Sequence, residues 1–142
     1  MKKILSTLMI IAALYSCDSN NNIYDSLPQP ISSFISTYWP NPSIASYTQP
    51  SSGKYEVTIK YGPTLDFDSN YRWTEIDGNG MPLPEMLLSD QLPEKLYDYL
   101  EGAAYLNDVF EIERDSKTYT VELNLDITLV YDIATKTIRG VQ

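Results

Sequence analysis

Four oxygen-bearing side chains in one stretch of the sequence have a spacing that could bind a calcium ion. Calcium loops of the EF-hand type need oxygen ligands at positions 1, 3, 5 and 12 and a glycine at position 6. Asp66, Asp68, Asn70 and Asp77 occupy the four ligand positions. Position 6 is Tyr71, where a positive φ is costly, and position 12 is an aspartate where a bidentate glutamate is usual.

The flanks of this stretch and its partial copy later in the chain argue against a metal site. The flanking residues alternate between apolar and polar, which is typical of strands, whereas an EF-hand loop lies between helices. In the copy, Asp68 recurs as Asp132. The other three candidate ligands are replaced by Val130, Ala134 and Val141. We therefore interpret Asp68-Ser69-Asn70 as a turn and predict neither a metal nor a cofactor.

Carboxylates are the main groups left that could support catalysis. The chain has no histidine and one cysteine, which removes the commonest general base, the usual nucleophile pairs and ordinary zinc sites. Glu111 and Glu113 share one face of a predicted strand, and a glycosidase needs only two carboxylates. A solvated strand face is the favoured interpretation of this pair, because acids are mostly exposed. No catalytic residue is predicted.

The only cysteine, Cys17, follows a segment typical of bacterial export. Lys2 and Lys3 precede an apolar run, Ile4–Leu14, which is shorter than the ~20 apolar residues that span a bilayer. Leu14-Tyr15-Ser16-Cys17 resembles a lipobox, whose cysteine is the site of lipid attachment; the alternative is an ordinary secretory signal with an incidental cysteine. We expect a signal peptide over 1–16 and a flexible tether over 17–26 that starts at lipidated Cys17.

The charge of the chain limits its partners. It has 19 acidic and 10 basic residues, a net charge of −9 at pH 7, and loss of the signal would remove Lys2 and Lys3 as well. Nucleic acid is excluded as a partner because phosphates require a basic patch, and contact with the membrane is expected only through the anchor. A basic protein or peptide partner is compatible with this charge, although solubility alone would also explain it. The sequence does not indicate an oligomeric state.

Two passages of the chain echo each other. The first begins with Leu27-Pro28 and the second with Leu92-Pro93, 65 residues later. Helical positions then correspond, and strand positions follow at a spacing of 64 residues; the pairs are Ile31/Leu96, Phe34/Tyr99, Ile35/Leu100, Tyr55/Tyr119, Val57/Val121, Ile59/Leu123, Leu65/Leu129 and Phe67/Tyr131. A period of this size, with helix and strand patterns in each copy, indicates two similar supersecondary units.

Each copy predicts a helix followed by about four antiparallel strands. Helical spacing is found over Leu27–Tyr38 and Leu92–Ala103, and Glu85–Leu88 is expected to be a short docked helix. Alternation predicts strands at Ile44–Tyr47, Tyr55–Tyr61, Leu65–Phe67, Tyr71–Ile76, Val109–Glu113, Tyr119–Asn124, Ile127–Tyr131 and Thr137–Val141.

The predicted fold class is α+β, with two tandem units that each pack a helix on an antiparallel sheet. The units are 27–80 and 92–142, joined by a docked connector over 81–91. Because a unit of ~60 residues is marginal on its own, we expect the two to pack on each other or to extend one sheet.

These motifs resemble those of a known family. The run LPxxIxxFIxxYWP, followed by GKYEV, LDFD, WTEIDG and PLP, resembles the PepSY-like, β-lactamase-inhibitor-like lipoproteins of Bacteroidetes. The resemblance covers Leu27–Val141, although the second copy lacks the tryptophan and the IDG turn. It implies a tandem helix-on-sheet fold, an exported and lipid-anchored protein, and a role in binding other proteins.

The favoured function is a non-enzymatic lipoprotein of the cell envelope that binds an envelope protein or peptide through its sheet face. Tyrosine and tryptophan on an open sheet are good contact residues, although they could instead cover the edge of the core. A small-ligand pocket and a carboxylate-based hydrolase are the alternatives. An outer-membrane anchor facing the periplasm is expected, since Ser19–Asn22 lacks an acidic cluster. The candidate contact residues are Glu56, Lys60, Tyr61, Tyr71, Arg72 and Trp73.

Overall fold

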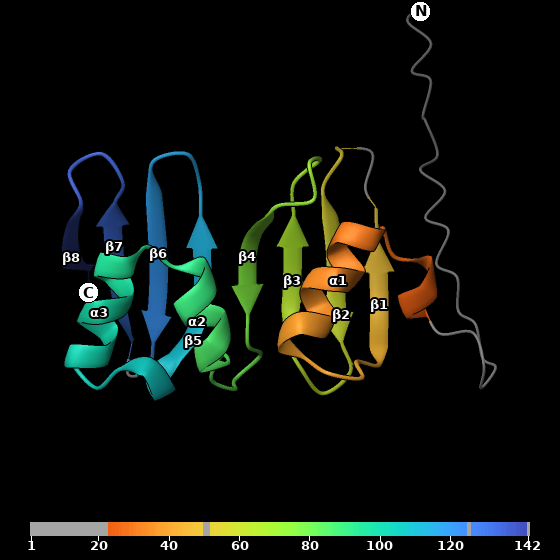
Figure 1. Ribbon diagram of the computed structural model, residues 1–142, viewed down its shortest axis with the longest axis horizontal. Helices are drawn as coiled ribbons and strands as arrows, with labels where there is room; N and C mark the ends of the chain where they lie inside the picture. Colours follow the sequence, from red (N-terminus) through yellow and green to blue (C-terminus); the bar gives the residue numbers. More distant parts are fainter. Residues whose placement is uncertain (1–22, 50–51, 125, 142) are drawn as a thin grey trace, which may run out of the picture.

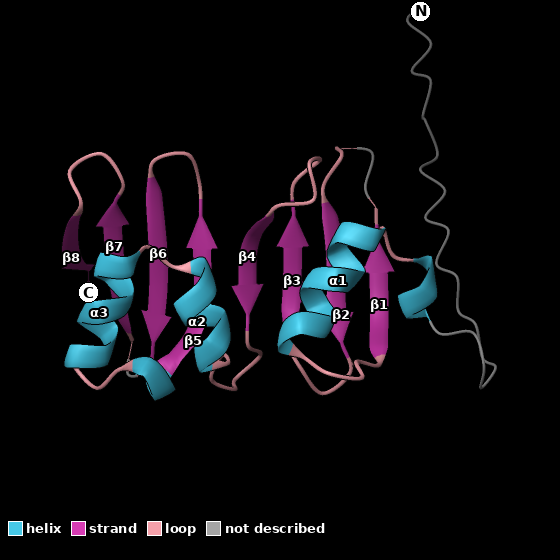
Figure 2. Ribbon diagram, in the orientation of Figure 1, coloured by secondary structure: helices cyan, strands magenta, loops and turns pink. Residues whose placement is uncertain are grey.

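The computed structural model describes residues 23–49, 52–124 and 126–141. Within these ranges the chain forms one antiparallel sheet of eight strands, with three α-helices on one of its faces (Figure 1). Strands that follow one another in the sequence are neighbours in the sheet, in the order β1 to β8. Figure 2 shows the helices as a layer in front of the strands. The α+β class is confirmed, and the face without a described helix is called the open face below.

The helices and strands coincide with the segments predicted from the sequence, and their ends differ by a few residues. A short 3-10 helix, η1 (Ile23–Ser26), and α1 (Gln29–Tyr38) precede β1 (Ile44–Thr48), β2 (Tyr55–Ile59), β3 (Thr64–Phe67) and β4 (Trp73–Asp77). Next come α2 (Glu85–Gln91), α3 (Glu94–Gly102) and a second 3-10 helix, η2 (Leu106–Asp108). The chain ends with β5 (Val109–Arg114), β6 (Thr118–Leu123), β7 (Ile127–Asp132) and β8 (Thr137–Val141).

One hydrophobic core lies between the helices and the sheet. Apolar residues at alternate strand positions point toward the helices, and Val57, Leu65 and Val121 have no exposed surface. Residues that correspond in the two echoing passages occupy matching buried positions on α1 and α3, and all belong to the same core cluster. These pairs are Ile31 with Leu96 and Ile35 with Leu100.

The two sets of strands join at the pairing between β4 and β5. Only three residue pairs are in register there: Glu75 with Glu113, Ile76 with Ile112, and Asp77 with Glu111. Ile76 and Ile112 are fully buried against the helices, so the core is continuous across the junction. The expectation that the strands extend one sheet is therefore confirmed.

A chain of hydrogen bonds links the helices above this junction. The Trp73 indole Nε1 donates to Gln91 Oε1 at 2.8 Å, and Gln91 Nε2 donates to the Tyr38 hydroxyl at 2.7 Å. The Tyr38 hydroxyl in turn donates to Asp90 Oδ2 at 3.2 Å. Residues of α1, α2 and β4 thus satisfy one another's polar groups, which explains why the apolar connector docks as α2 and does not remain a free linker.

Glycine is required where β4 ends. A Cβ on Gly78 would lie 2.0 Å from the carbonyl oxygen of Met81 and 2.9 Å from that of Phe110. The Gly78 N–H donates to the same Phe110 oxygen at 2.8 Å. Only a residue without a side chain allows β4 and β5 to approach this closely, which gives the IDG motif a structural reason.

Two details differ from the sequence expectations. Ile23–Ser26, expected to be part of a flexible tether, form η1, and the Tyr24 hydroxyl donates to the Ser32 carbonyl at 2.8 Å. Tyr71, expected to avoid a positive φ, has a φ of 62°. The predicted signal peptide and Cys17 lie outside the described residues. No helix in the described part of the chain is long and apolar enough to cross a membrane.

We predict that the protein unfolds in a single transition, because one core and one sheet include all eight strands. Ile112→Ala should lower the free energy of unfolding by about 2–4 kcal/mol without splitting the transition. Chemical denaturation followed by far-UV circular dichroism and by tryptophan fluorescence checks both points. Ile133→Ala is the matched control, since Ile133 is 38% exposed and its truncation should cost much less. Two separate transitions would contradict the shared core.

Candidate functional site

Seven carboxylates meet on the open face of the sheet. The strand register places them in two rows across β2 to β6, and together we call them the carboxylate band. In the first row, Glu56 pairs with Asp66, Asp66 with Glu75, and Glu75 with Glu113. The second row pairs Asp77 with Glu111 and Glu111 with Glu122.

The band positions alternate with the core positions of the same strands. Leu65 and Phe67 flank Asp66 in β3, and Ile76 lies between the two acids of β4. Since successive side chains of a strand point to opposite faces, burial of these apolar residues under the helices directs the acids to the open face. Ile112 orients Glu111 and Glu113 in β5 in the same way.

Crowding raises the pKa of carboxyl groups in the centre of the band. Burial raises the pKa of Glu111 to about 7, and repulsion from Glu122, Glu75 and Asp77 adds to the rise. Burial also raises the pKa of Glu75, although a hydrogen bond with Glu111 opposes that rise. Two carboxyl groups can share such a bond only when one of them holds a proton. At neutral pH the centre of the band is therefore close to its own titration midpoint.

Asp66 shows the same lack of compensation in a different way. Burial raises the pKa of its carboxyl group, and Lys54 only partly opposes this effect. Its Oδ1 atom is buried without a hydrogen-bond partner among the described residues. Like charges directly opposite each other destabilise a sheet, and within the described ranges no basic side chain forms an ion pair with the band. The arrangement lacks an internal cation.

The predicted contact residues do not form a single site. Glu56 belongs to the carboxylate band and is exposed. Lys60 and Tyr61 follow β2, where Tyr61 is 90% exposed with a φ of 58° and the Lys60 ammonium lies 5.3 Å from the centre of its ring. Tyr71 lies at the opposite end of the sheet, in the turn before β4, with its ring 5.2 Å from that of Tyr55.

Arg72 and Trp73 lie next to Tyr71 but face a different environment. Arg72 is exposed and forms an ion pair with Asp68, with Nη2 and Oδ2 3.0 Å apart. Trp73 is only 2% exposed, because an irregular register between β3 and β4 aligns it with Phe67 on the helix side. Trp73 therefore fits the alternative of covering the core edge, and Tyr71 partly does so too.

The four candidate calcium ligands are dispersed. Asp66 and Asp77 point to the open face, whereas Asp68 accepts hydrogen bonds from the backbone N–H groups of Asn70 and Arg72 at 2.8 and 3.0 Å. These bonds and the Arg72 guanidinium hold the pKa of Asp68 below its ordinary value, against the opposing effect of burial. Among the described residues, no group of three or more acids, histidines or cysteines is placed to hold a metal ion.

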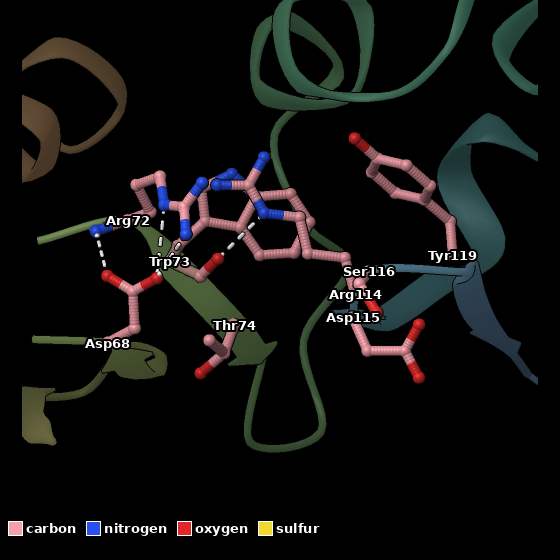
Figure 3. Close-up of a pocket in the computed structure, with 8 residues that line it drawn as sticks. All are labelled: Asp68, Arg72, Trp73, Thr74, Arg114, Asp115, Ser116 and Tyr119. Atoms are coloured by element: carbon pink, nitrogen blue, oxygen red, sulfur yellow. Dashed lines mark hydrogen bonds and ion pairs between the residues drawn. The ribbon is translucent and has the colours of Figure 1, made fainter. Parts of the chain in front are cut away.

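A second feature is a cavity of about 340 Å³ between the turn after β3 and the turn after β5 (Figure 3). We call it the notch, because the β4–β5 pairing ends at Glu75 and Glu113 and the two strands separate beyond this point. Arg72 and Trp73 line one side of the notch, and Arg114 and Tyr119 line the other.

Sequence patterns alone could not identify the carboxylate band. Glu111 and Glu113 were recognised as sharing a strand face, but their neighbours Glu75 and Asp77 lie on a strand more than 30 residues earlier. The signal that the sequence does contain is an acid at alternate positions of several predicted strands. Only the strand order and register turn these separate acids into a band.

Comparisons with known proteins agree with this architecture. The family described as "Putative beta-lactamase-inhibitor-like, PepSY-like" matches residues 53–139. No curated protein matches the chain. Among solved structures, a "putative calcium-regulated periplasmic protein" of Bacteroides thetaiotaomicron is 25% identical, with a TM-score of 0.70 over 84% of this chain and 93% of that one.

Two periplasmic proteins of Bacteroides vulgatus share the fold as well. One is 23% identical, with a TM-score of 0.66 over 84% of this chain and 93% of its own. The other is 21% identical, with a TM-score of 0.67 over 83% and 94%.

The pKa of Glu111 predicts how stability depends on pH. Between its ordinary value of 4.5 and about 7, the folded state retains a proton that the unfolded state releases. The free energy of unfolding should therefore fall as pH rises through this window. Glu111→Gln should flatten the dependence and raise stability at about pH 8 by about 1 kcal/mol, a small value because solvent screens a partly exposed group.

Urea denaturation at several pH values between about 5 and 8 measures this effect. Glu94→Gln, an exposed acid at the start of α3, makes the same charge change outside the band and should leave the slope of the wild type intact. An equal effect of the two substitutions would mean that net charge, and not the crowding of the band, determines the pH dependence.

Proposed function

This chain belongs to the PepSY-like family, and on that premise we propose that it is a non-enzymatic binding protein of the cell envelope. Its occupant is a basic segment of another envelope protein, which lies on the open face of the sheet. The observation that carries the proposal is the carboxylate band, seven acids in register with no ion-pair partner in the described part of the chain. A row of lysine or arginine side chains would supply the missing positive charge.

The dimensions of the band favour a basic segment over one metal ion. Neighbouring strands lie ~4.8 Å apart, so the four acids of the first row extend over about 14 Å. A calcium ion bonds oxygens at about 2.3–2.6 Å and can neutralise only part of such a row. An extended peptide places alternate side chains about 7 Å apart on one side. It can therefore offer several cations to both rows at once.

The absence of a catalytic role is part of the same proposal. The acids with raised pKa values lie on an open sheet face, where nothing excludes water from a substrate. The notch does contain two acids, Asp68 and Asp115. Backbone N–H groups of Lys117 and Thr118 hold the pKa of Asp115 below its ordinary value, and the pKa of Asp68 is also lowered. Neither can retain a proton at neutral pH to act as a general acid.

We also propose that the mature protein is attached to the outer membrane through lipidated Cys17 and faces the periplasm. The lipobox-like sequence supports the anchor, and the periplasmic description of the solved relatives supports the compartment. The matching buried pairs of α1 and α3 further support an origin of the fold in two tandem units.

Calcium is a second candidate occupant of the band. The relative from Bacteroides thetaiotaomicron is described as calcium-regulated, and carboxylate oxygens are the ligands that calcium prefers. The buried and unsatisfied Oδ1 of Asp66 also favours a cation near this face. In this candidate function, the ion would bind part of the band and change its affinity for a partner.

We predict that a short peptide alternating lysine with serine binds the mature protein, and that the same peptide with glutamate in place of lysine does not. The Glu75→Gln/Glu111→Gln double variant should bind the lysine peptide about tenfold more weakly and remain folded, because the change removes repulsion. Calorimetric titration at low and at physiological ionic strength measures the affinity and its salt dependence.

The control is Glu94→Gln/Glu101→Gln, which makes the same charge change at two exposed positions of α3. Equal weakening by both double variants would reduce the effect to net charge and overturn the proposed site. Titration with calcium chloride separates the two candidates. Micromolar calcium binding that depends on Glu75 and Glu111, without binding of the lysine peptide, would replace the basic segment with the ion.

A further inference from the structure

The notch has a chemistry opposite to that of the carboxylate band. Arg114 follows Glu113 in β5, and it points to the helix side of the sheet. Its guanidinium carbon lies 4.1 Å from the centre of the Trp73 ring. Its Nε donates to the Trp73 carbonyl at 2.8 Å (Figure 3), an acceptor that has no strand partner because the β4–β5 pairing has ended.

This position leaves most of the Arg114 guanidinium unused. Of its five N–H donors, only the one on Nε has an acceptor among residues 23–49, 52–124 and 126–141. The side chain is half-buried, so water has limited access to the remaining donors. Arginine donors in this situation are well matched to a planar acceptor such as a carboxylate, which takes two parallel hydrogen bonds.

The acids of the notch do not provide that acceptor. Asp68 is bound to Arg72 and to the backbone of its own turn. The Oδ1 atom of Asp115 accepts the backbone N–H groups of Lys117 and Thr118, both at 2.7 Å. Within the described residues neither acid forms an ion pair with Arg114, so an acceptor for its free donors has to come from outside the chain.

The other walls of the notch suit an apolar or aromatic group. The rings of Trp73 and Tyr119 lie 6.2 Å apart in an edge-to-face arrangement. Figure 3 shows the Tyr119 hydroxyl pointing toward the side on which the Arg114 guanidinium lies. A volume of about 340 Å³ is at the small end of ligand sites, enough for one ring or one amino acid residue.

We propose that the notch binds an organic carboxylate attached to an aromatic or apolar group. The carboxylate pairs with the free Nη donors of Arg114, and the attached group contacts the rings of Trp73 and Tyr119. This site lies on the helix side of the sheet and is independent of the basic segment proposed for the open face. Small aromatic acids and the carboxyl-terminal residue of a peptide share this chemistry.

Nuclear magnetic resonance titration with benzoate, benzamide and N-acetylphenylalanine tests the proposal on the mature protein. Benzoate should shift the indole N–H of Trp73 and the Nε–H of Arg114, and benzamide, its neutral counterpart, should not. Arg114→Lys should weaken benzoate binding about tenfold, because lysine keeps the charge but loses the planar pair of donors. The N-acetylphenylalanine arm distinguishes a peptide terminus, bound more tightly than benzoate, from a small acid.

Arg139→Lys, on the open face of β8, is the matched control and should leave binding unchanged. If Arg114→Lys does not fold, Tyr119→Phe removes only a hydroxyl from the notch and should weaken benzoate binding by a smaller factor. The proposal is overturned if benzamide shifts the same resonances as benzoate, if benzoate shifts neither, or if the folded notch variants bind like the wild type. None of these outcomes affects the lysine-peptide experiment, whose variants lie on the other face.

Discussion

The pairing of β4 with β5 is the constraint on which the rest of the structure depends. Three residue pairs connect the first four strands to the last four. Their central pair, Ile76 and Ile112, is fully buried and makes the core continuous beneath α2. Gly78 makes this close approach possible, since any side chain there would collide with the carbonyl of Phe110. Without this junction each set of strands would be close to the size at which a domain is marginally stable.

The same junction produces both candidate sites. On the open face it places Glu75 opposite Glu113 and Asp77 opposite Glu111, which joins acids of distant segments into one band. On the helix side it ends early, and the separation of the strands leaves the notch, where the side chain of Arg114 binds the carbonyl of Trp73 in place of a strand partner. One short stretch of register therefore determines where negative charge is concentrated and where a guanidinium is left with free donors.

The sequence predicted local structure well, because that structure depends on local patterns. Alternation identified all eight strands, and helical spacing identified the three α-helices. The irregular register that turns Trp73 to the helix side and the positive φ of Tyr71 could not be predicted, because both depend on how β4 packs against its neighbours. The band could be predicted only in part. The shared face of Glu111 and Glu113 follows from their spacing, but their opposition to Glu75 and Asp77 requires the strand order.

Solubility does not explain the arrangement of the acids on the open face. A soluble surface needs net charge and no large apolar patch, and acids scattered over turns and helices would supply the charge without strain. Directly paired carboxylates instead reduce stability, and here they raise the pKa of Glu111 to about 7. A cationic ligand reverses the sign of that interaction, because each carboxylate that repels its neighbour in the free protein attracts the ligand in the complex. The instability of the free band is thus a source of binding free energy, which the continuous core on the other face allows the fold to tolerate.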